Sequence, residues 1–223
     1  MNRALFVQAF AKFFSGLLLV GLLLFLPAGT FDFWQAWLLI GVLFAPMLLA
    51  GIVMMWKSPE LLQKRLNARE EQSEQKAVIA LSGLMFLASF LLAGFNRRFG
   101  WMELPAGVSW AAAVVLLLAY GLFAEVLREN AWLSRTVEVQ EGQKVVDKGL
   151  YGIVRHPMYT STVFLFLAMP LVLGSPLSFA VMLLSLPIIG RRIQNEERVL
   201  EEGLEGYREY KKRVRYRLIP YIW

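Results

Sequence analysis

The sequence of 223 residues contains no cysteine and a single histidine, His156. The lack of cysteine excludes disulfide bonds, thiolate zinc sites and a cysteine nucleophile. One histidine argues against a metal centre built from histidines. The chain also has no GxGxxG after a strand, no GxxxxGK[ST] loop and no HExxH pair. These absences exclude the usual dinucleotide and phosphate-binding folds and a zinc protease site, and no metal site is predicted.

Charged residues are scarce, at 18% of the chain, whereas 57% of residues are hydrophobic. The hydrophobic residues form long runs almost free of charge, and runs of this length are typical of membrane spans. Six such runs occur, at about Phe13–Leu26, Trp37–Trp56, Val78–Phe95, Val108–Val126, Met158–Leu173 and Leu177–Gly190. The N-terminal run also fits a signal peptide, but the runs that follow favour the first helix of a polytopic protein. The sequence therefore predicts an all-α, multi-pass integral membrane protein with about six transmembrane helices.

The basic residues are distributed unevenly between the two sides of the predicted membrane domain. The net charge is +6, and with the N-terminus inside, every Lys and Arg except Arg97 and Arg98 falls in an inside segment. The positive-inside rule then predicts that both termini and the longer polar segments are cytoplasmic, with the protein in the inner (plasma) membrane. Basic residues beside membrane helices are expected to contact anionic lipids, so no nucleic-acid partner is predicted.

The polar segments gather in the second half of the chain. The segment 57–76 begins with Ser58 and Pro59, an N-cap and a first-turn proline, which predicts a short connector helix. The segment 128–155 contains β-like stretches too short for a stable pair, so we expect an ordered loop. We predict one structural domain. In it, residues 1–127 form about four transmembrane helices with the connector 57–76, and residues 128–223 form a half that holds a cytoplasmic pocket.

The stretch "VRHPMY" places the lone histidine at the start of the fifth apolar run. Pro157 fits the first position of a helix because it lacks the N–H that would be unpaired there. The free N–H groups of a helix start and the charge of Arg155 favour an anion. His156 and Tyr159 are three residues apart and share one helix face. We predict a site for an anionic group here; the alternative is a lipid anchor, since such residues commonly flank membrane spans.

The stretch "QNEERVLEEG" follows the sixth apolar run and carries Glu196 and Glu197. The last two runs form a hairpin with a short "GSP" turn, so both open ends must meet at one membrane surface. We therefore expect one acid to turn toward the histidine, where a carboxylate can hold a cation or hydroxyl groups, or act as a base. The alternative is a solvated helix face, with an ion pair between Arg192 and Glu196.

The stretch "GYREYKKRVRYRLIPYIW" mixes aromatic residues with five closely spaced basic residues. Gly203 and Gly206 are expected to interrupt the preceding helix, so that a second short helix holds Tyr207 and Tyr210. An electrostatic lipid anchor is the alternative to a functional role.

In this order, "GLYGIVRHPMY", "NEERVLEE" and "GYREYKKRVRYRLIP" resemble the isoprenylcysteine carboxyl methyltransferase family and its phospholipid methyltransferase relatives, as a member of bacterial type. The resemblance covers about residues 129–223, and the earlier helices match by topology only. It implies a membrane methyltransferase that takes S-adenosylmethionine from the cytoplasm and leaves S-adenosylhomocysteine as product. It also implies a lipophilic acceptor from the bilayer: a prenylcysteine-like carboxylate, a lipid amine or another small lipophile.

The resemblance assigns roles to the residues at matching positions. It implies a cofactor pocket lined by Tyr151, Val154, Arg155, His156, Pro157 and Tyr159 and closed by Glu196 and Glu197. It places Tyr207, Tyr210, Arg213 and Arg217 near the cofactor and the substrate entrance. Arg155 and Glu197 are the candidates for the largest catalytic effect, and the sequence does not choose between them.

Two other classes stay open. Sterol reductases, membrane enzymes that use NADPH, resemble the chain distantly in their C-terminal half, including the ending "VRYRLIPYIW". Their histidine is not followed by proline, however, and their second motif usually carries Asp-Glu after Arg, where this chain has "NEE" before Arg198. A non-catalytic membrane scaffold is the third class, which predicts no cofactor binding and tolerance of His156→Ala.

Overall fold

The structure is a computed structural model that describes residues 3–66, 73–133 and 137–223. Parts of the predicted connector 57–76 and of the segment 128–155 therefore lie outside the described residues. Within the described ranges the chain forms helices, turns and loops but no strand, which confirms the all-α prediction.

Five segments of the described chain are long and apolar enough to cross a membrane. They are α1 (Arg3–Ala28), α2 (Trp34–Lys57), most of α4 (Ser73–Phe99), α5 (Ala106–Glu129) and the joined pair α7 (Pro176–Met182) and α8 (Ser185–Gly203). The chain is therefore a polytopic membrane protein, as predicted. The fifth apolar run becomes α6 (Pro157–Val172), which has 16 residues. At 1.5 Å per residue it measures about 24 Å, less than the hydrocarbon core of about 30 Å.

The shorter elements agree with the predicted helix signals. The connector begins with α3 (Pro59–Leu66), as Ser58 and Pro59 predicted. A 3₁₀ turn, η1 (Gly149–Gly152), precedes the histidine, and α9 (Tyr207–Arg213) follows α8. The helix break between α8 and α9 occurs at the predicted glycines, where Gly206 has a left-handed φ of 80°.

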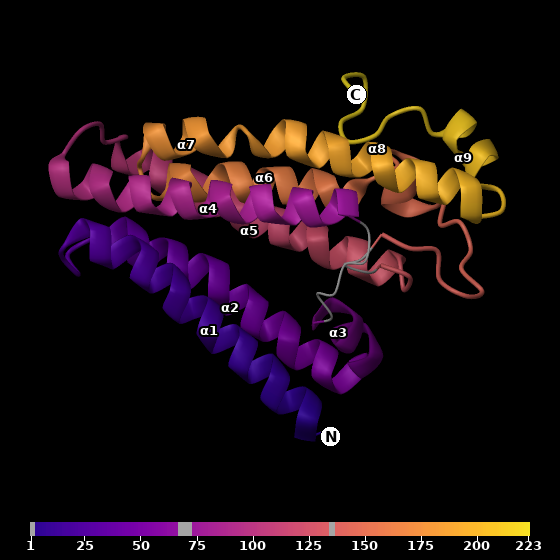
Figure 1. Cartoon of the computed structure of the whole chain (residues 1–223), viewed down its shortest axis with the longest axis horizontal. Helices are drawn as coiled ribbons and strands as arrows, with labels where there is room; N and C mark the ends of the chain where they lie inside the picture. Colours follow the sequence, from indigo (N-terminus) through magenta and orange to yellow (C-terminus); the bar gives the residue numbers. More distant parts are fainter. Residues whose placement is uncertain (1–2, 67–72, 134–136) are drawn as a thin grey trace.

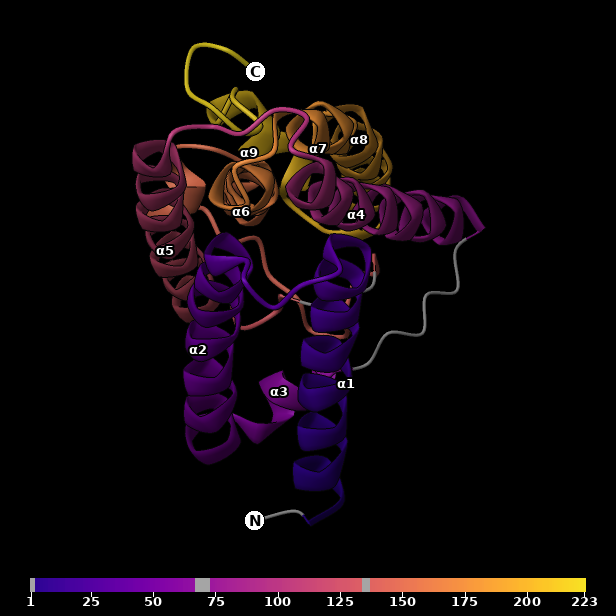
Figure 2. The same cartoon turned by 90° about the vertical axis from the view of Figure 1, so that its left-hand side faces the viewer.

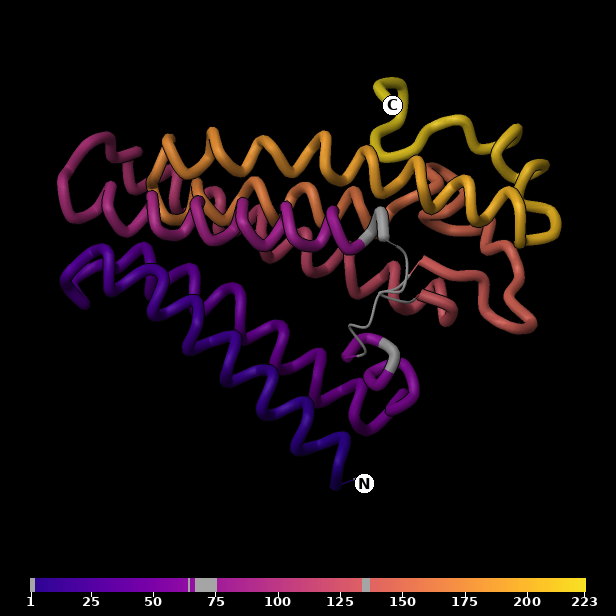
Figure 3. The backbone as a smooth tube through the Cα atoms, in the orientation of Figure 1, coloured from indigo at the N-terminus to yellow at the C-terminus, as the bar shows by residue number. Residues whose placement is uncertain are grey.

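The helices form a bundle with a hairpin set at an angle to it. α4, α5, α6 and the α7–α8 pair lie side by side, and α1 and α2 pack against them at one end (Figure 1). Viewed along the bundle, the hairpin lies on one side (Figure 2), and the backbone tube shows the two parts diverging from that end (Figure 3). We call this end, with the turns at residues 29–33, 100–105 and 174–175, the far end. The opposite end, with α3, η1 and α9, is the pocket end.

The main apolar core explains where the hairpin is attached. Leu24 of α1 and Leu39 of α2 are fully buried, together with Leu116 of α5. At Gly94 of α4 the backbones come close, since a Cβ there would lie 2.7 Å from the carbonyl oxygen of Leu24. Toward the pocket end the apolar side chains of α1 and α2 are exposed, as Phe10 is, and are free to face lipid.

Two smaller apolar clusters stand at the pocket end. One joins Tyr159 of α6 with Ile189 and Ile193 of α8 and with Leu218. The other is formed by Leu204, Tyr207, Tyr210 and Val214, with Val139 and Val145 packed against it. Together they anchor α9 and the following segment to the ends of α6 and α8, where polar groups are buried between them.

Candidate active site

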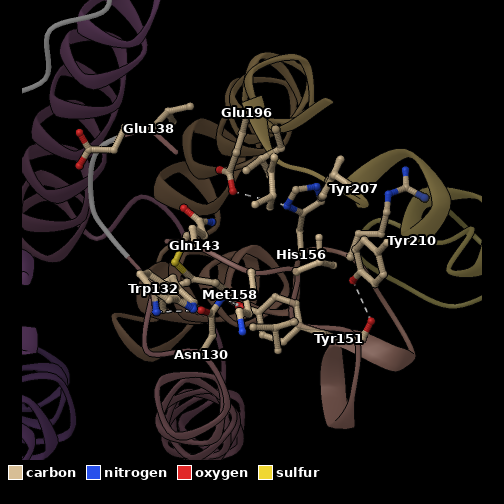
Figure 4. Close-up of a pocket in the computed structure, with 18 of the residues that line it drawn as sticks. Asn130, Trp132, Glu138, Gln143, Tyr151, His156, Met158, Glu196, Tyr207 and Tyr210 are labelled. Carbon is tan, nitrogen blue, oxygen red and sulfur yellow. Dashed lines mark hydrogen bonds and ion pairs between the residues drawn. The ribbon is translucent and has the colours of Figure 1, made fainter. Parts of the chain in front are cut away.

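A pocket opens at the pocket end between α6, α8, α9 and the segment after α5 (Figure 4). Its open space, including the part that is continuous with solvent at its mouth, is about 810 Å³. Its polar lining residues include Asn130, Glu138, Gln143, Arg155, His156, Arg192 and Glu196. Its aromatic lining residues include Trp132, Tyr151, Tyr207 and Tyr210.

Glu197 is the buried carboxylate behind the pocket, with 2% of its surface exposed. Its Oε1 accepts hydrogen bonds from Arg155 Nε at 2.7 Å and from His156 Nε2 at 3.2 Å. Its Oε2 accepts from Arg217 Nη2 at 3.0 Å, and Lys211 Nζ lies 3.5 Å away. Both carboxylate oxygens are therefore fully engaged, and a buried charge with this many partners is stabilised rather than free to act as a base.

Glu196 lies on the other side of the histidine and lines the pocket. The hydroxyl of Tyr159 donates to Glu196 Oε2 at 2.5 Å and accepts from Arg192 Nε at 2.9 Å. His156 Nδ1 stands 3.9 Å from Glu196 Oε1, too far for a hydrogen bond. With 24% of its side chain exposed, this carboxylate has an oxygen turned toward the pocket and available to a ligand.

The end of α5 fixes the position of Tyr151. Glu129 accepts from the Leu150 amide at 2.9 Å, and Asn130 Nδ2 donates to the Tyr151 hydroxyl at 2.9 Å. This contact requires glycine at 149, where φ is 58° and a Cβ would lie 1.9 Å from the Glu129 carboxylate. Burial raises the pKa of Tyr151 to about 12, so its ring lines the pocket as a neutral phenol.

Tyr207 and Tyr210 lie one turn apart in α9 but differ in their hydrogen bonds. Tyr210 donates its hydroxyl to the carbonyl oxygen of Tyr151 at 2.8 Å. The buried hydroxyl of Tyr207 has no hydrogen-bond partner among the described residues. Burial and the negative charges of Glu197 and Glu196 raise the pKa of Tyr207 far above its usual value, so the hydroxyl stays protonated. A buried phenol without a partner costs free energy, and a bound ligand can supply the missing hydrogen bond.

The structure brings the three predicted motifs together, and the hairpin argument required this only of "RHPMY" and "NEE". Of the twelve predicted site residues, seven line the pocket: Tyr151, Arg155, His156, Tyr159 and Glu196, together with Tyr207 and Tyr210 of α9. Val154 and Pro157 are buried but are not among the lining residues, and Glu197 and Arg217 support the wall from behind. Arg213 pairs at the surface with Asp147, at 2.7 Å. The roles assigned to all these residues stay predictions.

Several residues of the pocket were not predicted from the sequence. The segment after α5 contributes Trp132 and Gln143, and α6 contributes Met158. Lys211 was seen as part of a basic run, whereas it contacts Glu197 and Glu201. The segment after α5 shows only short β-like stretches before the "GLYGIVRHPMY" motif, and these do not indicate that Trp132 and Gln143 lie over the pocket. The pairing of Arg192 with Glu196, considered with the alternative of a solvated helix face, runs through the Tyr159 hydroxyl, which accepts from Arg192 and donates to Glu196.

Fold and pocket together define a polytopic helical membrane protein with a buried, charge-lined pocket at one end of its bundle. Residues 110–202 match the model of the isoprenylcysteine carboxyl methyltransferase (ICMT) family. The match supports the family inferred from the motifs, over a region that makes up less than half of the chain. It supports the class of membrane methyltransferase, while the bacterial type stays a prediction.

A second similarity is to the Delta(14)-sterol reductase of Mus musculus, with 33% identity over 91 residues. The matched stretch covers 40% of this chain and 22% of the mouse protein. The chain thus spans less than a quarter of that relative. The match agrees with the distant resemblance to sterol reductases in the sequence.

Proposed function

We propose that the chain is a methyltransferase that uses S-adenosylmethionine and acts on a lipophilic acceptor in the membrane. The observation that carries the proposal is the pocket itself. The "RHPMY" and "NEE" motifs of the matched family line one cavity, and Glu197 ties both to the segment after α9.

The residues of the pocket fit S-adenosylmethionine, which carries a carboxylate, an ammonium group, ribose hydroxyls and a sulfonium. Arg155 and His156 at the start of α6 suit the carboxylate. Glu196 suits the ammonium group or the hydroxyls, and tyrosine rings are favourable neighbours of a cation. The unpartnered Tyr207 hydroxyl adds a donor that the protein itself does not use. When bound, the cofactor supplies an electrophilic methyl group.

The residues of the chain then have to bind the cofactor, orient it toward the acceptor and exclude water. Little covalent catalysis is needed, because methyl transfer is an in-line displacement. Arg155 and Glu197 remain the candidates for the largest effect. With both of its oxygens engaged, Glu197 acts in this proposal as a positioning residue that holds Arg155, His156 and Arg217. Tyr210, Arg213 and Arg217 keep their proposed place near the entrance for the acceptor.

The proposal includes the orientation of the molecule. The pocket end carries nearly all of the basic residues, so it faces the cytoplasm of the inner (plasma) membrane, with both termini on that side. The acceptor is a lipid or another small lipophile that reaches the pocket from the bilayer. Residues 1–127 anchor the single domain in the membrane, and residues 128–223 form its catalytic half.

A reductase that uses NADPH is the second candidate, favoured by the similarity to the mouse sterol reductase. The charges in the pocket argue against it. The lining holds Glu138 and Glu196 together with Lys144, Arg155 and Arg192. This near balance suits a ligand with charges of both signs better than one with three phosphate groups, which needs an excess of cations.

The test is the transfer of a labelled methyl group. Membranes that contain the protein are incubated with S-adenosylmethionine labelled in its methyl group, and the lipids are extracted and counted. We expect label in the organic extract, and at least tenfold less with Arg155→Ala or His156→Ala. Arg128→Ala is the matched control, because Arg128 is exposed and pairs with Glu125 outside the pocket. Equal labelling by wild type and both pocket variants would refute the assignment.

A further inference from the structure

The segment 214–223, which we call the strap, crosses the start of α6. It is hydrogen-bonded to the turn that holds Arg155 and His156, which we call the histidine turn. The amides of Arg155 and His156 donate to the carbonyl oxygens of Tyr216 and Arg217, each at 2.9 Å. Arg155 Nη1 also donates to the carbonyl oxygens of Val214 and Arg215, at 2.8 and 2.7 Å. The position of the histidine turn therefore depends on the strap as well as on α6.

The tip of the strap is a closed loop held by Trp223. The carbonyl oxygen of Trp223 accepts from the amides of Arg217 and Leu218, at 2.8 and 2.9 Å. Its indole ring stacks on the guanidinium of Arg217, with 5.1 Å between Cζ and the ring centroid. Arg217 in turn donates to Glu197 Oε2 through Nε and Nη2. Trp223 thus fixes the main chain and the side chain of a residue that holds the central carboxylate.

The tip exposes apolar side chains whose contact with water is unfavourable. Tyr221 is 88% exposed and Ile222 is 75% exposed, next to the half-exposed Ile219 and Trp223. Clustered exposed apolar side chains usually mark a surface that is covered in the working protein. The covering partner is indicated by where the tip lies.

The tip lies at the end of the lipid-facing stripe of α8. Leu183 in the turn before α8 and Leu186 in its first turn are exposed apolar residues, and Gly190 lies one turn after Leu186 on the same face. A Cβ at Gly190 would lie 3.5 Å from the Trp223 ring, so the ring covers this position. The next residue, Arg191, is the first charge of α8. The change from apolar to charged residues marks the boundary between acyl chains and headgroups, so the tip stands at that depth.

The charges of the strap complement an anionic lipid surface. Five basic residues lie between positions 211 and 217, and no acidic residue follows Glu209. Tyrosine and tryptophan prefer the headgroup level, and adjacent basic residues add attraction to anionic lipids. Bilayer lipid therefore matches the tip in depth, in polarity and in charge.

We propose that the strap docks its tip, Ile219–Trp223, in the headgroup–acyl boundary of the bilayer that holds the chain, and that this contact keeps Arg217 and the histidine turn in position. Neither the docking nor its effect on the position of Arg217 depends on the proposed function. Trp223 and Arg217 are positioning residues in this arrangement, and lipid is the partner that stabilises them.

The docking is tested by measuring the depth of a probe, which requires no cofactor. Because the chain has no cysteine, Ile222→Cys gives one labelling site for an environment-sensitive fluorophore. Glu205→Cys is the control, in an exposed turn beyond the end of α8. In nanodiscs of phosphatidylcholine and phosphatidylglycerol, lipids with a quencher near the headgroup should quench the probe at 222 and not at 205. No quenching at 222, or equal quenching at both sites, would overturn the docking.

The coupling to the pocket is tested by amide hydrogen exchange in the same nanodiscs without ligand. Trp223→Ala should speed the exchange of the Arg155 and His156 amides several-fold, because their acceptors lie on the strap. Trp101→Ala, an exposed tryptophan at the far end, is the matched control and should leave the exchange unchanged. Unchanged exchange in Trp223→Ala would overturn the coupling, whatever ligand the pocket binds.

Discussion

At the scale of single residues, the two adjacent acids of the "NEE" motif have different surroundings. Glu197 is enclosed by Arg155, His156 and Arg217 and shares its charge among them. Glu196 bonds to a tyrosine hydroxyl and still lines the pocket. One acid therefore organises the site and the other is open to a ligand, although the sequence presents them as neighbours of the same kind.

The two tyrosines of α9 give a prediction in which binding and stability separate. Tyr207→Phe removes a hydroxyl that has no partner in the described structure, so the fold should be as stable as before or more so. If a ligand uses that hydroxyl, binding of S-adenosylhomocysteine weakens or the KM for the acceptor rises, by about tenfold for one hydrogen bond.

Tyr210→Phe should instead lower the stability of the fold, by about 1 kcal/mol, because it removes the hydrogen bond to the Tyr151 carbonyl oxygen. Calorimetry and thermal unfolding of the purified variants measure the two effects. Unchanged binding and unchanged KM in Tyr207→Phe would show that the hydroxyl does not meet a ligand.

At the scale of helices, the attachment of the α1–α2 hairpin through the main apolar core includes one close backbone contact. Gly94 lets α4 approach α1, and a Cβ there would also lie 2.9 Å from Pro27 Cβ. Close backbone approach at small residues is a usual source of helix association in membranes, where apolar surface gains little by leaving lipid.

Gly94→Ala should therefore push α1 away from α4 and destabilise the protein by about 1–3 kcal/mol, as overpacking does. Gly83→Ala is the matched control in the same helix, since a Cβ there meets nothing within 4 Å. Unfolding of both variants in mixed micelles measures the difference. Equal stability of the two variants would contradict the close contact at Gly94.

The sequence predicts the helices well and their packing poorly, for physical reasons. Apolar runs give the position of each helix, and the short turn after α6 forces "RHPMY" and "NEE" to one surface, so Arg155 and Glu197 could be joined in advance. The close approach of α1 to α4 at Gly94 has no sequence signature. The contact of Lys211 with Glu197 depends on how α9 folds back, and the place of Trp132 in the pocket depends on the irregular segment after α5.

At the scale of the whole molecule, the two ends of the bundle differ in charge and in the elements that they carry. The far end has short turns held by local bonds, such as the contact of Arg97 with Glu103 at 3.3 Å. The pocket end carries α3, α9, the strap and nearly all of the basic residues. This asymmetry is the basis for the proposed orientation, with the pocket in the cytoplasm.

The orientation is tested with single cysteines in the cysteine-free chain. Asp32→Cys probes the far end, where the side chain is 91% exposed, and Glu141→Cys probes an exposed turn at the pocket end. In sealed right-side-out vesicles, a membrane-impermeant maleimide should label position 32, and should label position 141 only after permeabilisation. The reverse pattern would contradict a cytoplasmic pocket.

The most direct test of the central claim is calorimetry of the detergent-purified protein with S-adenosylhomocysteine, and with NADPH as the competing ligand. A cofactor pocket built by Arg155, His156 and Glu196 predicts saturable binding of S-adenosylhomocysteine and none of NADPH. Binding of NADPH alone would contradict the account and move the chain to the reductases. Binding of neither ligand by folded protein would contradict it as well, and would leave a membrane scaffold as the explanation of the fold.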